Sequence, residues 1–211
     1  MKKLFSLFLL FAFSLCLTGC GNEISLPDSP PSHGKVTGQS YHNEYTGLRF
    51  TVNSDKWVFA SDEELAAGCN LTPNAYSSDF AHVLESNKTV YDMMATSEAH
   101  HMSVLTGFEN LTLAQEDPNM SAKDYVTKMI ENFSEGLTEE NPYEVSSTKN
   151  VTLCGHTYAR KILTVSGEDS WGEDYTISQA YYARNLGGYM SITLVFFPGT
   201  VTVEQVESLF V

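Results

Sequence analysis

Apolar and polar residues alternate over several short stretches of this chain, which is the pattern of half-buried β-strands. The first two pairs of stretches are residues 41–45 and 48–52, and residues 89–96 and 102–110. Four more stretches follow at residues 143–153, 156–165, 175–184 and 189–196. Because short turns join successive stretches, the strands are predicted to pair antiparallel.

Three helices are predicted from their start signals. Ser61 and Glu64 form a capping box, and Gly68 is a suitable end for that helix. Thr202 begins another capping box near the C-terminus. The longest helix begins at Ser121, and its apolar residues recur at spacings of three and four: Ala122, Tyr125, Val126, Met129, Ile130, Phe133 and Leu137. Residues 70–87 lack a clear period and are predicted as a long loop, with a short helical turn near residues 78–84.

This order of strands and helices predicts an α+β fold. Helices with one apolar face need a flat apolar partner, which a sheet provides. We expect a single curved antiparallel β-sheet of about seven to eight strands, flanked by helices. The chain length after residue 38 suits one domain, so residues 39–211 are predicted to be a single domain.

The N-terminus carries an export signal. Lys2 and Lys3 precede an apolar run over residues 4–17, and Leu17-Thr18-Gly19-Cys20 matches a bacterial lipobox at all four positions. An uncleaved membrane helix and a signal peptide without lipidation are the alternatives, but the apolar run is short for a span, which takes about 20 residues. We therefore expect residues 1–19 to be a lipoprotein signal peptide and Cys20 to be lipidated, on the extracytoplasmic face of the cell membrane.

Residues 20–38 are predicted to be the lipidated cysteine and a flexible linker. The segment holds several proline, serine and glycine residues and has almost no apolar period. Such a composition is typical of an extended spacer.

Charge and cysteine content narrow the class of partner. The chain has 26 Asp and Glu against 12 Lys and Arg, a net charge of −14 with neutral histidines, which disfavours binding to nucleic acid. Cys69 and Cys154 are the cysteines outside the signal and the lipobox. Export makes a disulfide between them plausible, but the spacing alone does not decide whether it forms.

No catalytic motif or cofactor fingerprint is recognisable in the sequence. Glu98, His100 and His101 have metal-ligand side chains, but adjacent residues on a strand point to opposite faces, so we interpret them as a polar turn and predict no metal site. We expect no cofactor and no enzymatic activity.

Several segments resemble a group of small lipoproteins from gut Firmicutes with the PsbP-like fold, an α/β/α sandwich. The segments are residues 41–50, Trp57, residues 62–65, residues 91–95 and residues 179–182. The resemblance covers nearly all of the folded part and implies a scaffolding or binding role, without any catalytic residue.

Two functions remain open from the sequence. The favoured one is a membrane-anchored, non-enzymatic binding or accessory module, whose partner is an envelope protein, a peptide or a glycan. The alternative is a small cell-envelope hydrolase whose site is assembled from distant residues. It would need a concave pocket with converging His, Ser or carboxylate groups and a strongly perturbed pKa.

Overall fold

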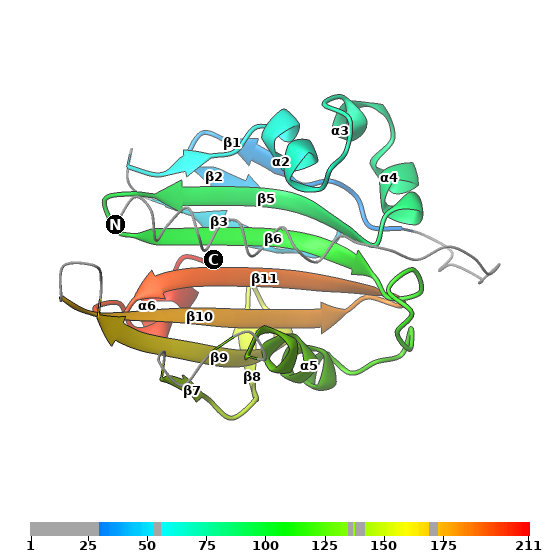
Figure 1. Ribbon diagram of the computed structural model, residues 1–211. Coiled ribbons are helices and arrows are strands. Elements are labelled where there is room, and N and C mark those ends of the chain that lie inside the picture. Colours follow the sequence, from blue (N-terminus) through cyan, green and yellow to red (C-terminus); the bar gives the residue numbers. More distant parts are fainter. Residues whose placement is uncertain (1–29, 53–55, 135–136, 138–141, 169–172) are drawn as a thin grey trace.

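One large antiparallel sheet dominates the computed structural model, which describes residues 30–52, 56–134, 137, 142–168 and 173–211. Its strands are β4 (Val58–Phe59), β5 (Thr89–Ser97), β6 (Met102–Asn110), β7 (Tyr143–Val145), β8 (Lys149–Leu153), β9 (His156–Glu168), β10 (Asp174–Asn185) and β11 (Tyr189–Pro198). The eight strands run in the order β4-β5-β6-β11-β10-β9-β7, and β8 pairs with β9 (Figure 1). The predicted α+β class is confirmed.

A second, three-stranded sheet is formed by β1 (Lys35–Thr37), β2 (Ser40–His42) and β3 (Arg49–Thr51). The predicted hairpin is present, because Tyr41 pairs with Phe50 across β2 and β3. β1 was not predicted, since it lies in the segment interpreted as a flexible linker. Val36 pairs with Tyr41, so the ordered chain includes residues before 39. The prediction of a flexible linker is therefore wrong for β1.

The helices are α2 (Asp62–Gly68), α3 (Ala75–Ser78), α4 (Phe80–Ser86), α5 (Ala122–Ser134) and α6 (Val203–Glu207). Both predicted capping boxes are present, at Ser61 with Glu64 and at Thr202 with Gln205. The predicted long loop over residues 70–87 is instead largely helical, and the helical turn predicted near residues 78–84 is present as α4. Asp79 caps α4, whose Phe80, Val83 and Leu84 are buried, and this spacing of three and four is a helical signal that the polar flanking residues obscured.

The predicted strand over residues 143–153 is two strands, because the chain leaves the sheet between them. Both β7 and β8 pair with β9. At the break the hydroxyl of Ser146 accepts a hydrogen bond from the Ile162 amide, 2.9 Å away. At the bend, the Ser146 side chain thus replaces a backbone carbonyl as the hydrogen-bond acceptor between the strands.

Neighbouring residues of β10 belong to different apolar clusters, as alternation along a strand requires. Ala180 and Tyr182 pack with residues of β2, β3 and α6. Tyr181 and Ala183 pack with residues of α5. The small sheet and α6 therefore cover one face, and α5 covers part of the other face (Figure 1).

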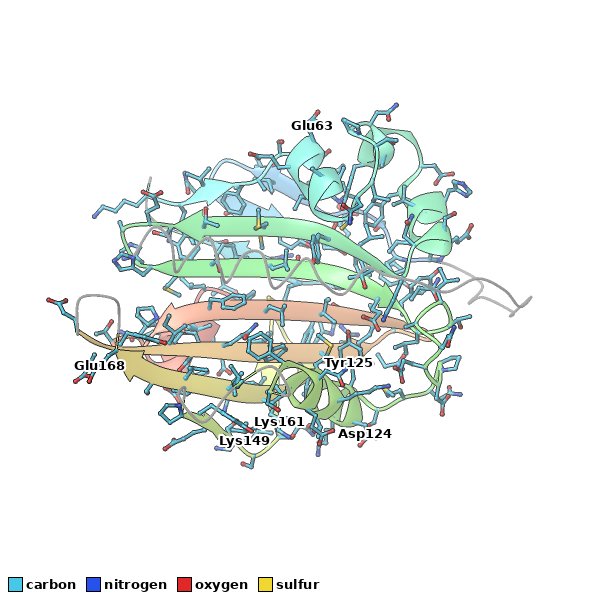
Figure 2. The ribbon with its side chains drawn as sticks, in the orientation of Figure 1. Glu63, Asp124, Tyr125, Lys149, Lys161 and Glu168 are labelled. Carbon is cyan, nitrogen blue, oxygen red and sulfur yellow. The ribbon has the colours of Figure 1, made fainter. Side chains whose placement is uncertain are left out.

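The helix α5 has the orientation that its sequence predicts. Tyr125, Val126 and Ile130 are buried, whereas Asp124 is exposed (Figure 2). A third apolar cluster joins α2, α3 and α4 to β5 and β6. Within the described ranges, no helix combines the length and the apolar character needed to cross a membrane.

Candidate functional site

A β-bulge in β5 turns Asp92 into the protein interior. The register between β5 and β6 shifts between Tyr91 and Met93, so Asp92 is the extra residue. Bulges of this kind redirect one side chain away from regular alternation. Asp92 is 2% exposed although it is ionisable. Gly107 lies opposite Tyr91, and its lack of a side chain leaves room for the Val90 carbonyl.

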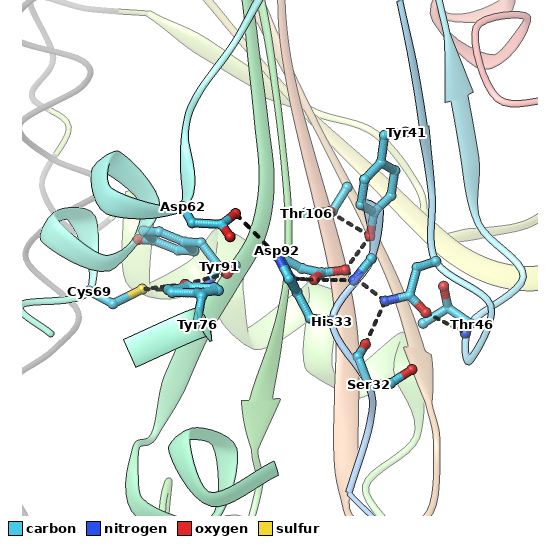
Figure 3. Close-up of polar contacts among 12 residues, drawn as sticks. Ser32, His33, Tyr41, Thr46, Asp62, Cys69, Tyr76, Tyr91, Asp92 and Thr106 are labelled. Carbon is cyan, nitrogen blue, oxygen red and sulfur yellow. Dashed lines mark hydrogen bonds and ion pairs between the residues drawn. The ribbon is translucent and has the colours of Figure 1, made fainter. Parts of the chain in front are cut away.

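Four donors surround the Asp92 carboxylate (Figure 3). Its Oδ1 lies 2.6 Å from His33 Nδ1 and accepts a 2.8 Å hydrogen bond from the Gly34 amide. Its Oδ2 accepts hydrogen bonds from the Tyr41 hydroxyl and, at 2.7 Å, from Asn43 Nδ2. Each carboxylate oxygen of Asp92 therefore has two hydrogen-bond partners, so its acceptor capacity is satisfied.

All four donors come from residues 33–43, and Asp92 fastens this N-terminal region to the main sheet. We call residues 32–37 the strap, which contains the donors His33 and Gly34. Asn43 adds to its attachment, because Asn43 Nδ2 also donates to the Ser32 carbonyl at 2.8 Å. The Thr46 amide donates to Asn43 Oδ1 at 2.9 Å and so fixes the orientation of that side chain. A Cβ on Gly34 would lie 2.4 Å from the Tyr41 ring, so glycine allows the close approach.

His33 lies between two carboxylates and two aromatic rings. Its Nε2 is 3.3 Å from Asp62 Oδ1, on the opposite side of the ring from Asp92. Its ring centre is 5.1 Å from that of Tyr76 and 4.9 Å from that of Phe80. The His33 side chain is 22% exposed, against 1% for Asp92 and 52% for Asp62. We call Asp62, His33 and Asp92 the carboxylate clasp.

The surroundings raise the pKa of the proton donors in this site. Burial, the largest influence on His33, lowers its pKa, but the hydrogen bond and the charge of Asp92, with smaller contributions from Asp62, outweigh it and leave the pKa above its ordinary value. Burial, followed by the Asp92 charge, raises the pKa of Tyr41 well above its usual range. Tyr41 therefore stays a neutral donor to Asp92.

Tyr76 and Cys69 hold the residue before the bulge. The Tyr76 hydroxyl donates to the Tyr91 carbonyl, and the Tyr91 amide donates to Cys69 Sγ at 3.2 Å. Burial, followed by interactions with Cys69, raises the pKa of Tyr76, so its hydroxyl remains protonated. Side chains from α2 and α3 thus help to place Asp92.

This arrangement is suited to holding the chain together rather than to acting on a bound molecule. Both ring nitrogens of His33 face carboxylate oxygens, and both Asp92 oxygens accept two hydrogen bonds. A nucleophilic site needs a hydroxyl or thiol within hydrogen-bond reach of the histidine. In the part of the chain that the structure describes, the hydrogen-bond partners of the His33 ring are the oxygens of the two carboxylates.

A second buried carboxyl group, that of Glu109, lies on β6 opposite Thr89, three positions before Asp92 along β5. Glu109 accepts a hydrogen bond from the Tyr125 hydroxyl at 3.1 Å and one from Thr89 at 3.5 Å. Burial raises the pKa of Glu109, and the charge of Lys88 opposes that rise. The contact connects α5 to β6.

A surface hollow of about 470 Å³ also borders α5, lined by Met120, Asp124, Thr127, Lys128, Glu131 and Asn132.

Of the predicted site residues that the structure describes, Cys69 lies beside the clasp, whereas Cys154 lies in another apolar cluster. Cys20, the predicted lipidation site, lies outside the described residues, as do the signal peptide and the first part of the linker. Glu98, His100 and His101 lie in the turn between β5 and β6. Across the described ranges, no three His, Cys, Asp or Glu residues are grouped as metal ligands.

Neither Cys69 nor Cys154 forms a disulfide, so the candidate bridge is not formed in this structure. The reason is that they occupy separate clusters. Cys69 packs with α2, α3 and α4, whereas Cys154 packs beside the small sheet. Cys154 Sγ accepts a hydrogen bond from the Arg49 amide at 3.1 Å.

We expect a reducing agent to leave the midpoint of thermal unfolding unchanged, because no crosslink constrains the unfolded chain. Differential scanning calorimetry with and without reductant tests this expectation. Peptide mapping under non-reducing conditions is the control, and each cysteine should be found on its own peptide. A peptide joining Cys69 to Cys154 would contradict the structure.

The sequence analysis missed His33 and Asp92 as a pair. His33 lies in a segment whose composition indicated a linker, and Asp92 lies 59 residues further along the chain. One signal was available, because Asp92 is a lone charged residue within the apolar strand over residues 89–96. A buried charge of that kind needs a partner, although its position alone does not name the partner.

Neither a protein-family model nor a curated protein matches this chain. Among solved structures, the chain is similar to the solution structure of cyanobacterial PsbP (CyanoP) from Synechocystis sp. PCC 6803. The two share 12% sequence identity with a TM-score of 0.43, over 92% of this chain and 93% of the other. The fold class given above rests on the strands and helices of this chain itself.

Proposed function

We propose that this protein is a lipid-anchored accessory protein on the extracytoplasmic face of the cell membrane. In this proposal Cys20 carries the lipid, residues 39–211 together with the strap form the binding domain, and the partner is an envelope protein, a peptide or a glycan. The domain acts by binding, without catalysing a reaction. The lipobox at residues 17–20 is the observation that carries the membrane anchorage.

The buried attachment of the strap supports this role. Asp92 holds His33 and Gly34 through contacts of 2.6 and 2.8 Å, only a short distance along the chain from Cys20. A chain that is pulled at a lipid anchor needs a firm attachment to its domain, and a satisfied buried carboxylate provides one. The tether would therefore end at a defined point on the domain surface.

The saturation of the clasp supports a role without catalysis. The hydrolase alternative requires a histidine or carboxylate that can exchange a proton with a substrate. At the clasp these groups bind one another, and the same contacts that raise the pKa of His33 occupy its ring nitrogens. No observation at this site favours the hydrolase.

Affinity capture from crosslinked cells tests the proposal, with Cys20→Ala as the variant that cannot be lipidated. We expect the natural chain to fractionate with membranes and to capture a specific envelope partner, and we expect Cys20→Ala to lose both. Cys154→Ala is a matched control, since it removes a thiol outside the lipobox. Equal membrane attachment of the Cys20→Ala variant would refute the anchor.

A further inference from the structure

The two carboxylates of the clasp favour the doubly protonated form of His33. Its Nδ1 is 2.6 Å from an Asp92 oxygen, and its Nε2 is 3.3 Å from an Asp62 oxygen. A neutral imidazole has one N–H, so its other nitrogen would present a lone pair to a carboxylate. The imidazolium form donates from both nitrogens and satisfies both contacts.

Within the strap, the His33 ring makes the side-chain contacts with the rest of the domain. The side chains of β1 are exposed, and β1 is held to β2 by backbone pairing. By contrast, His33 is packed against Tyr76 and Phe80 and reaches the buried Asp92. Loss of the His33 contacts would leave the strap attached by the edge strand β1 and by two hydrogen bonds, from the Gly34 amide to Asp92 and from Asn43 to the Ser32 carbonyl.

We infer that Asp62, Asp92, Tyr76 and Phe80 form an intramolecular binding slot for the imidazolium of His33, and that occupancy of this slot decides whether the strap docks on the domain. Docking or undocking of the strap would thus change the length of the tether. This inference extends the proposed function, because an undocked strap would join the linker to the lipid anchor.

Undocking would change the reach of the domain from the membrane. The six residues of the strap would pass from the domain to the tether, and an extended chain spans at most about 3.3–3.6 Å per residue. The added reach is at most about 20–22 Å. A change of that size exceeds the radius of gyration of a 100-residue domain, which is about 13 Å.

The direction of the pH response follows from the raised pKa of His33. A group whose pKa is higher in the docked state stabilises docking fully below its undocked pKa, and that stabilisation disappears as the pH rises through the docked value. Docking is therefore favoured below the ordinary histidine pKa of 6.5, and this stabilisation is lost as the pH rises through the higher pKa of docked His33.

The other titratable groups at the clasp come from several elements. They are Asp92 from β5, Asp62 from α2, Tyr76 from α3 and Tyr41 from β2, while Phe80 from α4 is uncharged. The pKa values of Tyr41 and Tyr76 are raised, so neither tyrosine ionises before His33 loses its proton.

Hydrogen exchange of the strap amides tests this inference, measured on the full chain in detergent micelles at pH 6 and pH 9. After correction for the intrinsic exchange rate, we expect the protection of residues 32–37 to fall by about threefold or more in the natural chain, since one pKa unit corresponds to a tenfold change. His33→Asn keeps one donor but cannot be protonated, so its protection should no longer depend on pH.

His82→Asn is the matched control, because His82 is exposed on α4 and should leave the response unchanged. Equal protection at both pH values in the natural chain, or an unchanged response in His33→Asn, would overturn the inference. This experiment needs no membrane partner, so its failure is distinguishable from failure of the capture experiment.

Discussion

Replacing Asp92 by Asn is expected to lower the free energy of unfolding by about 3–5 kcal/mol, the usual cost of breaking a buried charged pair. Asparagine has one acceptor oxygen, and its amide presents hydrogens where the carboxylate accepts. Either His33 and Gly34, or Tyr41 and Asn43, would then face a donor instead of an acceptor. Urea denaturation followed by circular dichroism measures the loss.

Asp174→Asn is the matched control, because Asp174 is an exposed aspartate on β10. Its effect should stay within about 0.5 kcal/mol, as for other surface substitutions. If Asp92→Asn fails to fold, Tyr41→Phe removes a single donor and is expected to cost about 1–3 kcal/mol, because it leaves part of the carboxylate unsatisfied. A loss below about 1 kcal/mol for Asp92→Asn would show that the carboxylate does not hold the strap.

A double substitution measures how far the stabilising effects of His33 and Asp92 depend on each other. If His33 and Asp92 act through one another, the combined loss in the His33→Asn and Asp92→Asn chain should be smaller than the sum of the two separate losses. Residues in direct contact commonly show coupling of about 0.5–3 kcal/mol. Additive losses would mean that Asp92 stabilises the fold mainly through Gly34, Tyr41 and Asn43.

The sequence could predict the parts of the fold that depend on neighbouring residues. The capping boxes at Ser61 and Thr202 involve residues three positions apart, so their pattern is local and the structure contains both. The strand pairs over β5 and β6, and over β10 and β11, were also recognisable, because alternation and a short turn set each register.

The clasp could not be predicted in the same way, because it joins residues that only the tertiary fold brings together. His33 is surrounded by Pro30, Pro31, Ser32 and Gly34, a composition that favours a linker when no partner is known. Its partner is reached through a bulge in β5. A bulge changes the direction of one side chain without changing the alternating pattern enough to reveal itself.

The same limit explains the outcome for the cysteines. Cys69 and Cys154 satisfied the sequence criterion for an exported disulfide, namely two cysteines outside the signal and lipobox. Their separation in space depends on which helix covers which part of the sheet. Cys69 follows α2, and Cys154 lies in the turn between β8 and β9. Chain order contains no information on the distance between these two places.

Replacing Gly107 by Ala is expected to lower the free energy of unfolding by about 3 kcal/mol, at the upper end of the usual cost of overpacking. The new Cβ would lie 2.5 Å from the Val90 carbonyl oxygen and 3.1 Å from the Tyr91 Cα. Both are backbone atoms of β5, so relief requires a shift of the strand itself. Chemical denaturation measures the loss.

Gly167→Ala is the matched control for this substitution, since Gly167 also lies within a strand. Its new Cβ would meet the Tyr175 side chain, with the hydroxyl oxygen 2.9 Å away, and that side chain can rotate. We expect a change below about 1 kcal/mol, because alanine also restricts the unfolded chain and offsets part of the contact.

The Gly107→Ala chain should also lose part of the pH response of the strap. The strand shift would occur at Val90 and Tyr91, directly before Asp92, and would move the carboxylate away from His33. A chain that is destabilised but keeps the full response would mean that the bulge stabilises the sheet without positioning the clasp. If the Gly107→Ala chain is as stable as the natural one, β5 can shift at the bulge without a cost in free energy. Gly107 would then not be the residue that holds Asp92 in place.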